Sequence, residues 1–160
     1  MFQVNTTLTI SSSSLSTITD WTESNSQSTF GFKRVGSAVS VSSGEFTVSR
    51  LGVYRVYLQL SIYNQGGSAE ARYFQCDLGF TPNGGSVITG DYYDPLPVLQ
   101  SSYTYNCCNR MMYQNFNHAN DKIIVRVATS SSGNNYIKGG DGSNGYESFI
   151  VFEWVAPPVA

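Results

Sequence analysis

Apolar and polar residues alternate along much of this chain, and a period of two predicts β-strands. The clearest strand covers residues 53–63. Every second residue of it is apolar and falls on one face: Tyr54, Val56, Leu58, Leu60 and Ile62. No window shows the i, i+3, i+4 spacing of a helix. Further strands are predicted at 2–10, 30–35, 38–42, 45–50, 70–80, 101–115 and 122–128, with shorter ones at 86–90 and 136–138.

Two strands carry specific expectations about burial. In residues 70–80, Phe74, Cys76, Leu78 and Phe80 are expected to face the core, and Tyr73, Gln75 and Asp77 the solvent. The last strand, residues 147–155, is apolar on both faces. Such a strand lies either between two layers or at a subunit interface. In a two-layer sandwich each sheet has only one core face, so the second apolar face predicts a partner chain.

About ten strands in a chain of 160 residues indicate a single all-β domain, a sandwich of the Greek-key or jelly-roll type. Residues 28–160 form this jelly-roll domain in our interpretation. Residues 1–27 are an N-terminal strand or arm followed by a Ser/Thr-rich segment. The Ser/Thr-rich stretch 11–29 is an arm, a linker or a loop anchored by Trp21.

Composition narrows the classes of function. Charged residues make up only 12 % of the chain and the net charge is −2. The chain has no basic patch, so we expect it not to bind nucleic acid. The start has no positive region followed by an apolar core, so we expect no signal peptide in this chain. No apolar run is long enough to insert into a membrane.

The residue types of catalysis are present without the patterns that enzymes need. His118 is the only histidine, and with Cys107 or Cys108 and Asp121 it could make a nucleophile, base and acid set. His118 falls in a predicted turn, however, and the sequence has no nucleophile-elbow motif, the sharp turn between strand and helix that presents a nucleophile in hydrolases. Asp91 and Asp94 share one loop, with no partner across a groove for glycoside hydrolysis. The chain is therefore expected not to be an enzyme.

Metal and cysteine patterns are equally sparse. Asp141 lies in a Gly-rich stretch resembling a calcium loop but lacks the ligand spacing of one. Calcium at Asp141 stays the one cofactor worth testing, and no other metal or cofactor is expected. Three cysteines are an odd number for a disulfide framework. We expect all three cysteines to be free thiols, with Cys76 in the core. The pattern assigns no role to Cys107 and Cys108.

Tyrosine is abundant near the predicted loops. Tyrosine offers a large contact area at a small loss of conformational entropy, as binding surfaces require. The alternative is that these tyrosines only fill the solvent faces of strands. The recognition candidates are Tyr92, Tyr93, Tyr136 and Tyr146.

Three segments resemble the tumour-necrosis-factor-like superfamily, most closely its complement globular-head (C1q-like) branch. Gly44-Glu45-Phe46-Thr47-Val48 and Gly52-Val53-Tyr54-Arg55-Val56 are similar to the family's G-x-F-x-(V/C) and G-(V/L/I)-Y-x-(F/V) signature. Residues 116–125 resemble its turn and strand L-x-x-G-D-x-V-x-V, with Asn120 in place of Gly. We expect Asn120 to tolerate the left-handed conformation of such a turn. Residues 148–152 resemble the closing strand S-x-F-x-G-x-L only loosely.

The resemblance implies a ten-stranded jelly roll that forms a homotrimer, with the sheet of the first and last strands facing the threefold axis. This agrees with the two-sided apolar strand at 147–155. The expected interface residues are Tyr57, Gln59, Tyr63, Phe149 and Val151. The alternative is a monomer whose tyrosines are solvated.

Two functions follow. The first is a structural or adhesive component of a virus or phage particle: a capsid protein, a capsid decoration or a fibre head. Its partners would be its own copies and other particle proteins. The alternative is a secreted or surface ligand, similar to the complement heads, that recognises a receptor or a glycan. The expected location is accordingly a virion or the extracellular space.

Overall fold

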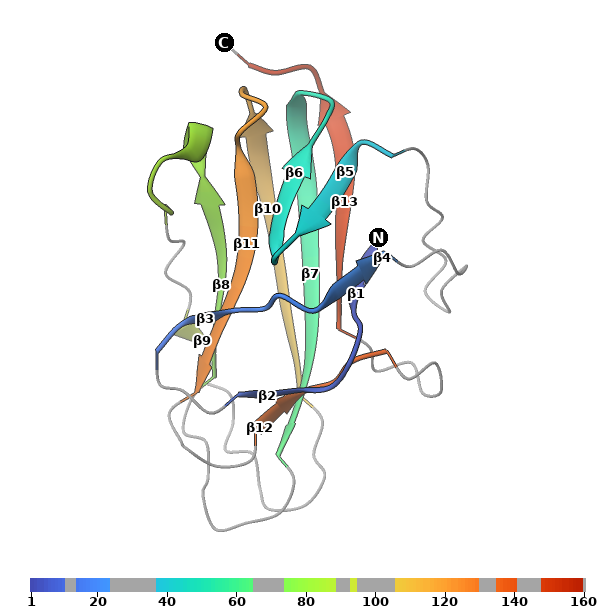
Figure 1. Ribbon diagram of the computed structural model, residues 1–160, viewed down its shortest axis with the longest axis vertical. Coiled ribbons are helices and arrows are strands. Elements are labelled where there is room, and N and C mark those ends of the chain that lie inside the picture. The colour runs from blue at the N-terminus through green and yellow to red at the C-terminus, as the bar shows by residue number, and fades with distance from the viewer. Residues whose placement is uncertain are drawn as a thin grey trace.

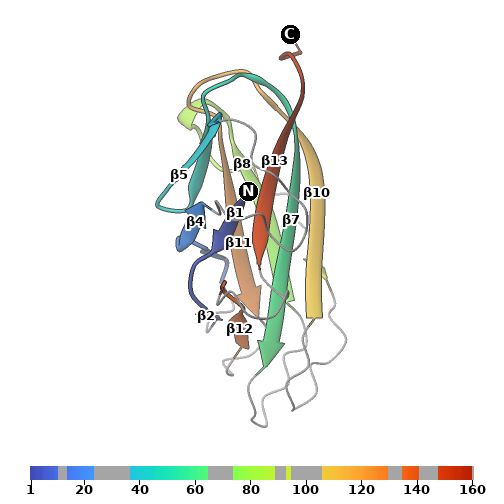
Figure 2. The same cartoon turned by 90° about the vertical axis from the view of Figure 1, so that its right-hand side faces the viewer.

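A computed structural model describes residues 1–10, 14–23, 37–64, 74–88, 93–94, 106–129, 135–140 and 148–159. These residues form two antiparallel sheets that pack face to face, as the two perpendicular views show (Figures 1 and 2). The described part contains a 3-10 turn, Pro82–Gly84, and no α-helix. The predicted all-β jelly-roll sandwich is confirmed.

The larger sheet is built around one long strand, β7 (Gly52–Asn64). One edge of β7 pairs with β10 (Asn106–Phe116), and every residue of β10 takes part in this pairing. The other edge pairs first with β13 (Phe149–Ala156) and then with β12 (Asn135–Ile137). The sheet continues through β1 (Phe2–Val4) and β4 (Trp21–Glu23) on the β13 side, and through β2 (Leu8–Ile10) beyond β12.

The smaller sheet has β11 (Lys122–Thr129) and β8 (Phe74–Thr81) at its centre. β6 (Glu45–Val48) and β5 (Val39–Ser42) extend it on one side, and β9 (Tyr93–Asp94) extends it on the other. The two-residue strand β3 (Ser16–Thr17) pairs with β11 at Arg126 and Val127. Every pairing between the described strands is antiparallel.

The core lies between the sheets and follows the predicted alternation. The five apolar residues of 53–63 are at most 1 % exposed, and Cys76 is fully buried. Phe46 of β6 is fully buried at the centre of an aromatic cluster with Phe2, Trp21 and Phe152. Because large apolar side chains stabilise a fold in proportion to the area that they bury, this interlayer core supplies most of the cohesion.

The N-terminal segment departs from the expected single strand at 2–10. The chain forms β1, leaves that position at Asn5 and Thr6, which both hydrogen-bond to Asp20, and then forms β2 beside β12. Residues 14–23 are not an arm or a linker, because β3 and β4 pair within the two sheets. Trp21 does anchor this stretch: its ring is buried and its Nε1 donates to the Ile18 carbonyl at 2.8 Å.

Two expectations about β8 and its surroundings are wrong. Gln75 and Asp77 do not face solvent but are 8 % and 1 % exposed. Asp77 stays buried because its Oδ2 accepts two hydrogen bonds from the Arg126 guanidinium on the neighbouring strand. A strand at 86–90 is reduced, among its described residues, to one bridge between Ile88 and Phe80. The expected strand at 30–35 and residues 70–73 lie outside the described residues.

The two motif glycines are required by the backbone. Gly44 has φ +81°, and a Cβ there would lie 2.5 Å from the Ile18 carbonyl oxygen. Gly52 has φ +149°, and a Cβ would lie 2.4 Å from the Ala156 carbonyl oxygen. Side chains rarely adopt such φ values, and both sites lack room for one. Asn120, in contrast, does not adopt a left-handed conformation: among the non-glycine residues described, Ser43 and Asn83 do.

Candidate interface on the outer face of the larger sheet

The face of the larger sheet that points away from the core carries side chains in cross-strand rows. The register of β10, β7 and β13 places Met111, Tyr57 and Val151 directly side by side. One row nearer the start of β7 lie Tyr113, Arg55 and Glu153, and one row further along lie Asn109, Gln59 and Phe149. Directly opposed side chains in a sheet are close enough to contact one another, so the three rows form one continuous surface.

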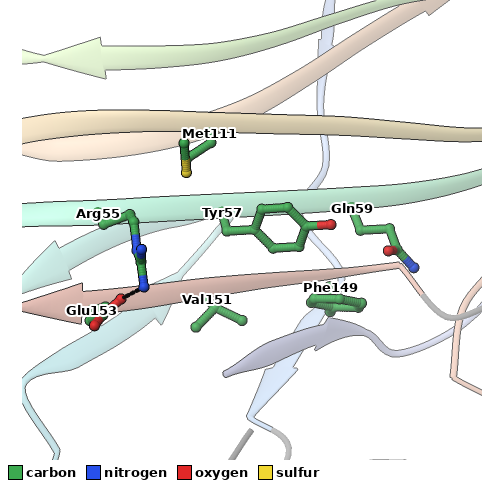
Figure 3. A pocket seen from close by; sticks show the side chains of 7 residues that line it. All are labelled: Arg55, Tyr57, Gln59, Met111, Phe149, Val151 and Glu153. Carbon is green, nitrogen blue, oxygen red and sulfur yellow. Dashed lines mark ion pairs between the residues drawn. The ribbon is translucent and has the colours of Figure 1, made fainter. Parts of the chain in front are cut away.

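The middle of this surface is hollowed. A hollow of about 380 Å³ is lined mainly by apolar atoms (Figure 3). Its lining residues are Arg55, Tyr57, Gln59, Met111, Phe149, Val151 and Glu153. Met111 is 60 % exposed, as is its neighbour Tyr113 on β10. The large side chains of Met111 and Tyr113 are therefore exposed to solvent on the β10 side of the hollow.

The polar groups around the hollow largely satisfy one another. Arg55 and Glu153 form an ion pair across β7 and β13, and both are about half exposed (Figure 3). The hydrogen bond from Arg55 to Glu153 raises the pKa of the arginine, so this cation stays charged at any physiological pH. The Tyr57 hydroxyl donates to Asn109 Oδ1 at 3.1 Å. Burial, and then the neighbouring Cys107, raise the pKa of Tyr57.

The structure brings together four of the five residues predicted for the interface. Tyr57, Gln59, Phe149 and Val151 all line the hollow. The Phe149 ring packs against Tyr57 with centroids 5.9 Å apart and is only 2 % exposed within the protomer. Tyr63 faces the same side but lies further along β7, outside the lining of the hollow.

Tyr63 instead pairs with one of the predicted recognition residues. Its ring stacks on Tyr136 of β12 at a centroid distance of 5.1 Å and an interplanar angle of 20°. Tyr136 is therefore part of a sheet face and not of a free loop. The backbone of Tyr93 lies in β9. Tyr92, Tyr146 and the calcium candidate Asp141 lie outside the described residues.

Sequence reasoning missed Met111, Arg55 and Glu153. Met111 falls on an odd position of the predicted strand 101–115, but nothing in that segment indicates which neighbour it meets. Arg55 and Glu153 look like ordinary solvated charges until the register places them opposite each other. The missing signal in each case is the pairing of strands that are far apart in the chain.

Asp121, one of the residues weighed for catalysis, has a structural role, and Asp91 lies outside the described residues. Asp121 is 2 % exposed, and its carboxylate accepts hydrogen bonds from the backbone N–H groups of Asn83, Asn117 and His118. His118 Nδ1 lies 3.7 Å from the same carboxylate. Cys107 is exposed on the outer face of β10, where its sulfur is 3.8 Å from Ser61 Oγ. Three backbone N–H groups occupy three of the roughly four acceptor sites of this carboxylate, so Asp121 serves as an anchor for two turns.

The described residues contain no group of three or more His, Cys, Asp or Glu side chains arranged to hold a metal ion. They also contain no helix long and apolar enough to cross a membrane.

Comparison with known proteins identifies the fold. No protein-family model and no curated protein sequence matches the chain. Among solved structures, Eiger TNF from S. frugiperda matches with a TM-score of 0.61 at 17 % identity, over 99 % of this chain and 92 % of that one. Murine APRIL matches with a TM-score of 0.61 at 14 % identity, over 96 % and 95 %. The chain has a tumour-necrosis-factor-like jelly-roll fold.

The matched structures confirm the jelly-roll fold that the resemblance implied. The specific likeness to the complement globular-head branch stays a prediction, since the matched structures do not single it out. In this TNF-like chain the last long strand, β13, lies between β7 and β1, the first strand. The hollowed surface is therefore the outer face of the sheet that contains both ends of the jelly roll.

Proposed function

We propose that this protein is a non-enzymatic, homotrimeric binding module that acts outside cells and recognises a receptor or a glycan. Its protomers associate through the hollowed face of the larger sheet. The observation that supports this best is the row Met111, Tyr57 and Val151, an apolar strip on a face that the protomer leaves open. Met and Tyr are enriched at the centres of protein interfaces.

The charges on this face suit association with a second copy. Arg55 and Glu153 neutralise each other within one protomer, so an approaching copy meets no net charge at the hollow. Desolvating an ion pair that is already formed is less unfavourable than desolvating a lone charge. In a ring of three copies, each protomer contacts its two neighbours through two different surfaces. The ring is closed, so no contact surface is left exposed at an end.

The alternative functions differ in their support. The similarity to Eiger TNF and APRIL favours a ligand-like module over a component of a virus or phage particle. No observation on the described residues favours partners from a particle, so we propose an extracellular location and a receptor or glycan partner. Tyr136, which stacks on the predicted interface residue Tyr63, is the recognition candidate whose side chain the structure describes.

The test of association is the mass in solution. Light scattering at micromolar concentration should give about three times the 17.5 kDa of the chain. Met111→Asp should give a folded monomer, because the residue is 60 % exposed in the protomer but would place three carboxylates in one desolvated interface. Phe149 is a poorer choice, since it is already buried within the protomer and a charge there would disturb the fold.

Ile88→Asp is the matched control. Ile88 is also an apolar residue with 60 % exposure, but it is bridged to the smaller sheet. This variant should remain a trimer with an unchanged melting temperature. A monomeric wild type, or the same mass for both variants, would contradict the proposed interface.

The recognition role is tested with the same pair of variants. The labelled wild type and Ile88→Asp should bind intact cells or a glycan array. Met111→Asp should bind at least tenfold more weakly, because a monomer loses the avidity of three linked sites. Equal binding by monomer and trimer would remove the reason for a trimeric ligand.

A further inference from the structure

Two of the three cysteines meet inside the sandwich. Cys76 lies on β8 in the smaller sheet and Cys108 on β10 in the larger one, so the pair spans the two layers. Their side chains are 0 % and 1 % exposed and belong to the same hydrophobic core. A hydrogen bond with Cys108 raises the pKa of the Cys76 thiol, so the two side chains approach each other across the core. To form a bond, the two sulfurs must move to bonding distance, and the close-packed side chains around them must adjust to the geometry of the bond.

Cys107 does not compete for this partner. It is exposed on the opposite face of β10, next to Ser61. Successive residues of a strand point to opposite sides of the sheet, so a bond between Cys107 and Cys108 would distort the strand. The geometry therefore selects one pair out of the three combinations.

The folded core protects this pair from exchange chemistry. The hydrogen bond with Cys108, and then burial, raise the pKa of the Cys76 thiol well above its usual value, and the nearby Arg110 opposes them only in part. The thiolate is the form that attacks a disulfide, so the folded protein exchanges slowly. A bond between the two sulfurs is therefore made while the chain folds, before the sheets close.

We propose that Cys76 and Cys108 form a disulfide that joins the two sheets when the chain folds in the presence of a small disulfide oxidant such as oxidised glutathione. The Cys108 thiolate attacks one glutathione sulfur, which forms a mixed disulfide and releases one glutathione thiolate. The Cys76 thiolate then attacks the Cys108 sulfur and releases the second glutathione. Two protein thiols are oxidised, one glutathione disulfide is reduced, and the two thiol protons pass to the released glutathiones.

The cross-link has a measurable effect on stability. It closes the loop between residues 76 and 108, which restricts the unfolded chain far more than the folded one. For a loop of this length in a domain of this size, the melting temperature should rise by about 10 °C. Disulfides of this kind persist in oxidising surroundings, where we place the protein, but the bond depends only on the two sulfurs and the oxidant.

The experiment uses Cys107→Ser, which leaves only the two core cysteines. The full chain is unfolded and refolded in reduced and oxidised glutathione, and in parallel with dithiothreitol. The oxidised sample should be lighter by the mass of two hydrogen atoms and should yield a peptide linked through Cys76 and Cys108. Its melting temperature should exceed that of the reduced sample by about 10 °C. The control, Cys76→Ala in the same background, should show no difference between the two conditions.

Several outcomes would overturn the proposal. One is a refolded Cys107→Ser protein that retains two thiols under oxidising conditions. A second is a stable glutathione adduct on either core cysteine. A third is a linked protein that melts no higher than the reduced one. In the wild type, a linkage between Cys107 and Cys108 as the main product would overturn it as well.

Discussion

Replacing Asp121 tests how the fold holds its loops together. The Oδ2 atom accepts hydrogen bonds from the backbone N–H groups of Asn117 at 2.7 Å and His118 at 2.9 Å. The Oδ1 atom accepts one from the backbone N–H of Asn83 at 2.7 Å. One buried carboxylate therefore fastens the turn between β10 and β11 to the Pro82–Gly84 turn that follows β8.

The three hydrogen bonds set the size of the effect. A hydrogen bond to a charged group contributes roughly 1.5–3 kcal/mol, and the low end applies here because these donors are only partly buried. Asp121→Ala removes all three and should lower the free energy of unfolding by about 4 kcal/mol. Asp121→Asn keeps an accepting oxygen for the N–H groups of Asn117 and His118. Its NH₂ group then faces the Asn83 N–H, so this hydrogen bond is lost, and the free energy of unfolding should fall by about 2 kcal/mol.

Urea unfolding followed by tryptophan fluorescence measures these losses at one fixed protein concentration. Melting temperatures should fall by about 12 °C for Asp121→Ala and about 6 °C for Asp121→Asn. The control is Glu45→Gln, which removes an ion pair with Lys122 whose two side chains are 45 % and 30 % exposed. It should change stability by less than about 1 kcal/mol. If both Asp121 variants fall within the range of this control, the carboxylate does not hold the turns.

Two further predictions concern the core. Phe46→Ala should destabilise the protein by about 3–5 kcal/mol in urea unfolding, because the ring is fully buried and lies 5.2 Å, 5.3 Å and 5.4 Å from three other aromatic rings; a loss below about 1 kcal/mol would contradict the cluster. Burial raises the pKa of Tyr54, against the Arg50 charge, so the folded state binds this proton more tightly than the unfolded state. Wild-type stability should therefore fall as the pH rises above about 10 more steeply than that of Tyr54→Phe, and parallel pH profiles would refute this.

The sequence predicted the central strands well because their burial is periodic. In β7, one-sided burial forces an apolar residue at every second position, and this pattern survives in the chain without any knowledge of its partners. The strands β3 and β4 could not be predicted in the same way, since two or three residues carry no periodicity. Their positions depend on pairing with β11 and β1, which is a long-range property.

The motif residues show the same division. Gly44, Gly52 and Phe46 could be recognised as a pattern, but the reason for each is tertiary: two carbonyl oxygens of distant segments, and three aromatic rings. The burial of Asp77 is a comparable case. Asp77 alternates with core residues along its strand, so the sequence predicts that it faces solvent. In the structure Arg126 on the neighbouring strand covers this carboxylate and neutralises its charge.

By itself, the sequence determined the all-β class, the buried face of the long strand β7, and the presence of a second apolar face on the last strand. Only the tertiary structure decided which residues share that face, that Met111 stands beside Tyr57 and Val151, and that Cys76 meets Cys108. The physical reason is that side-chain alternation is a local consequence of the extended backbone. Register and sheet packing are instead set by contacts between segments that are far apart in the chain.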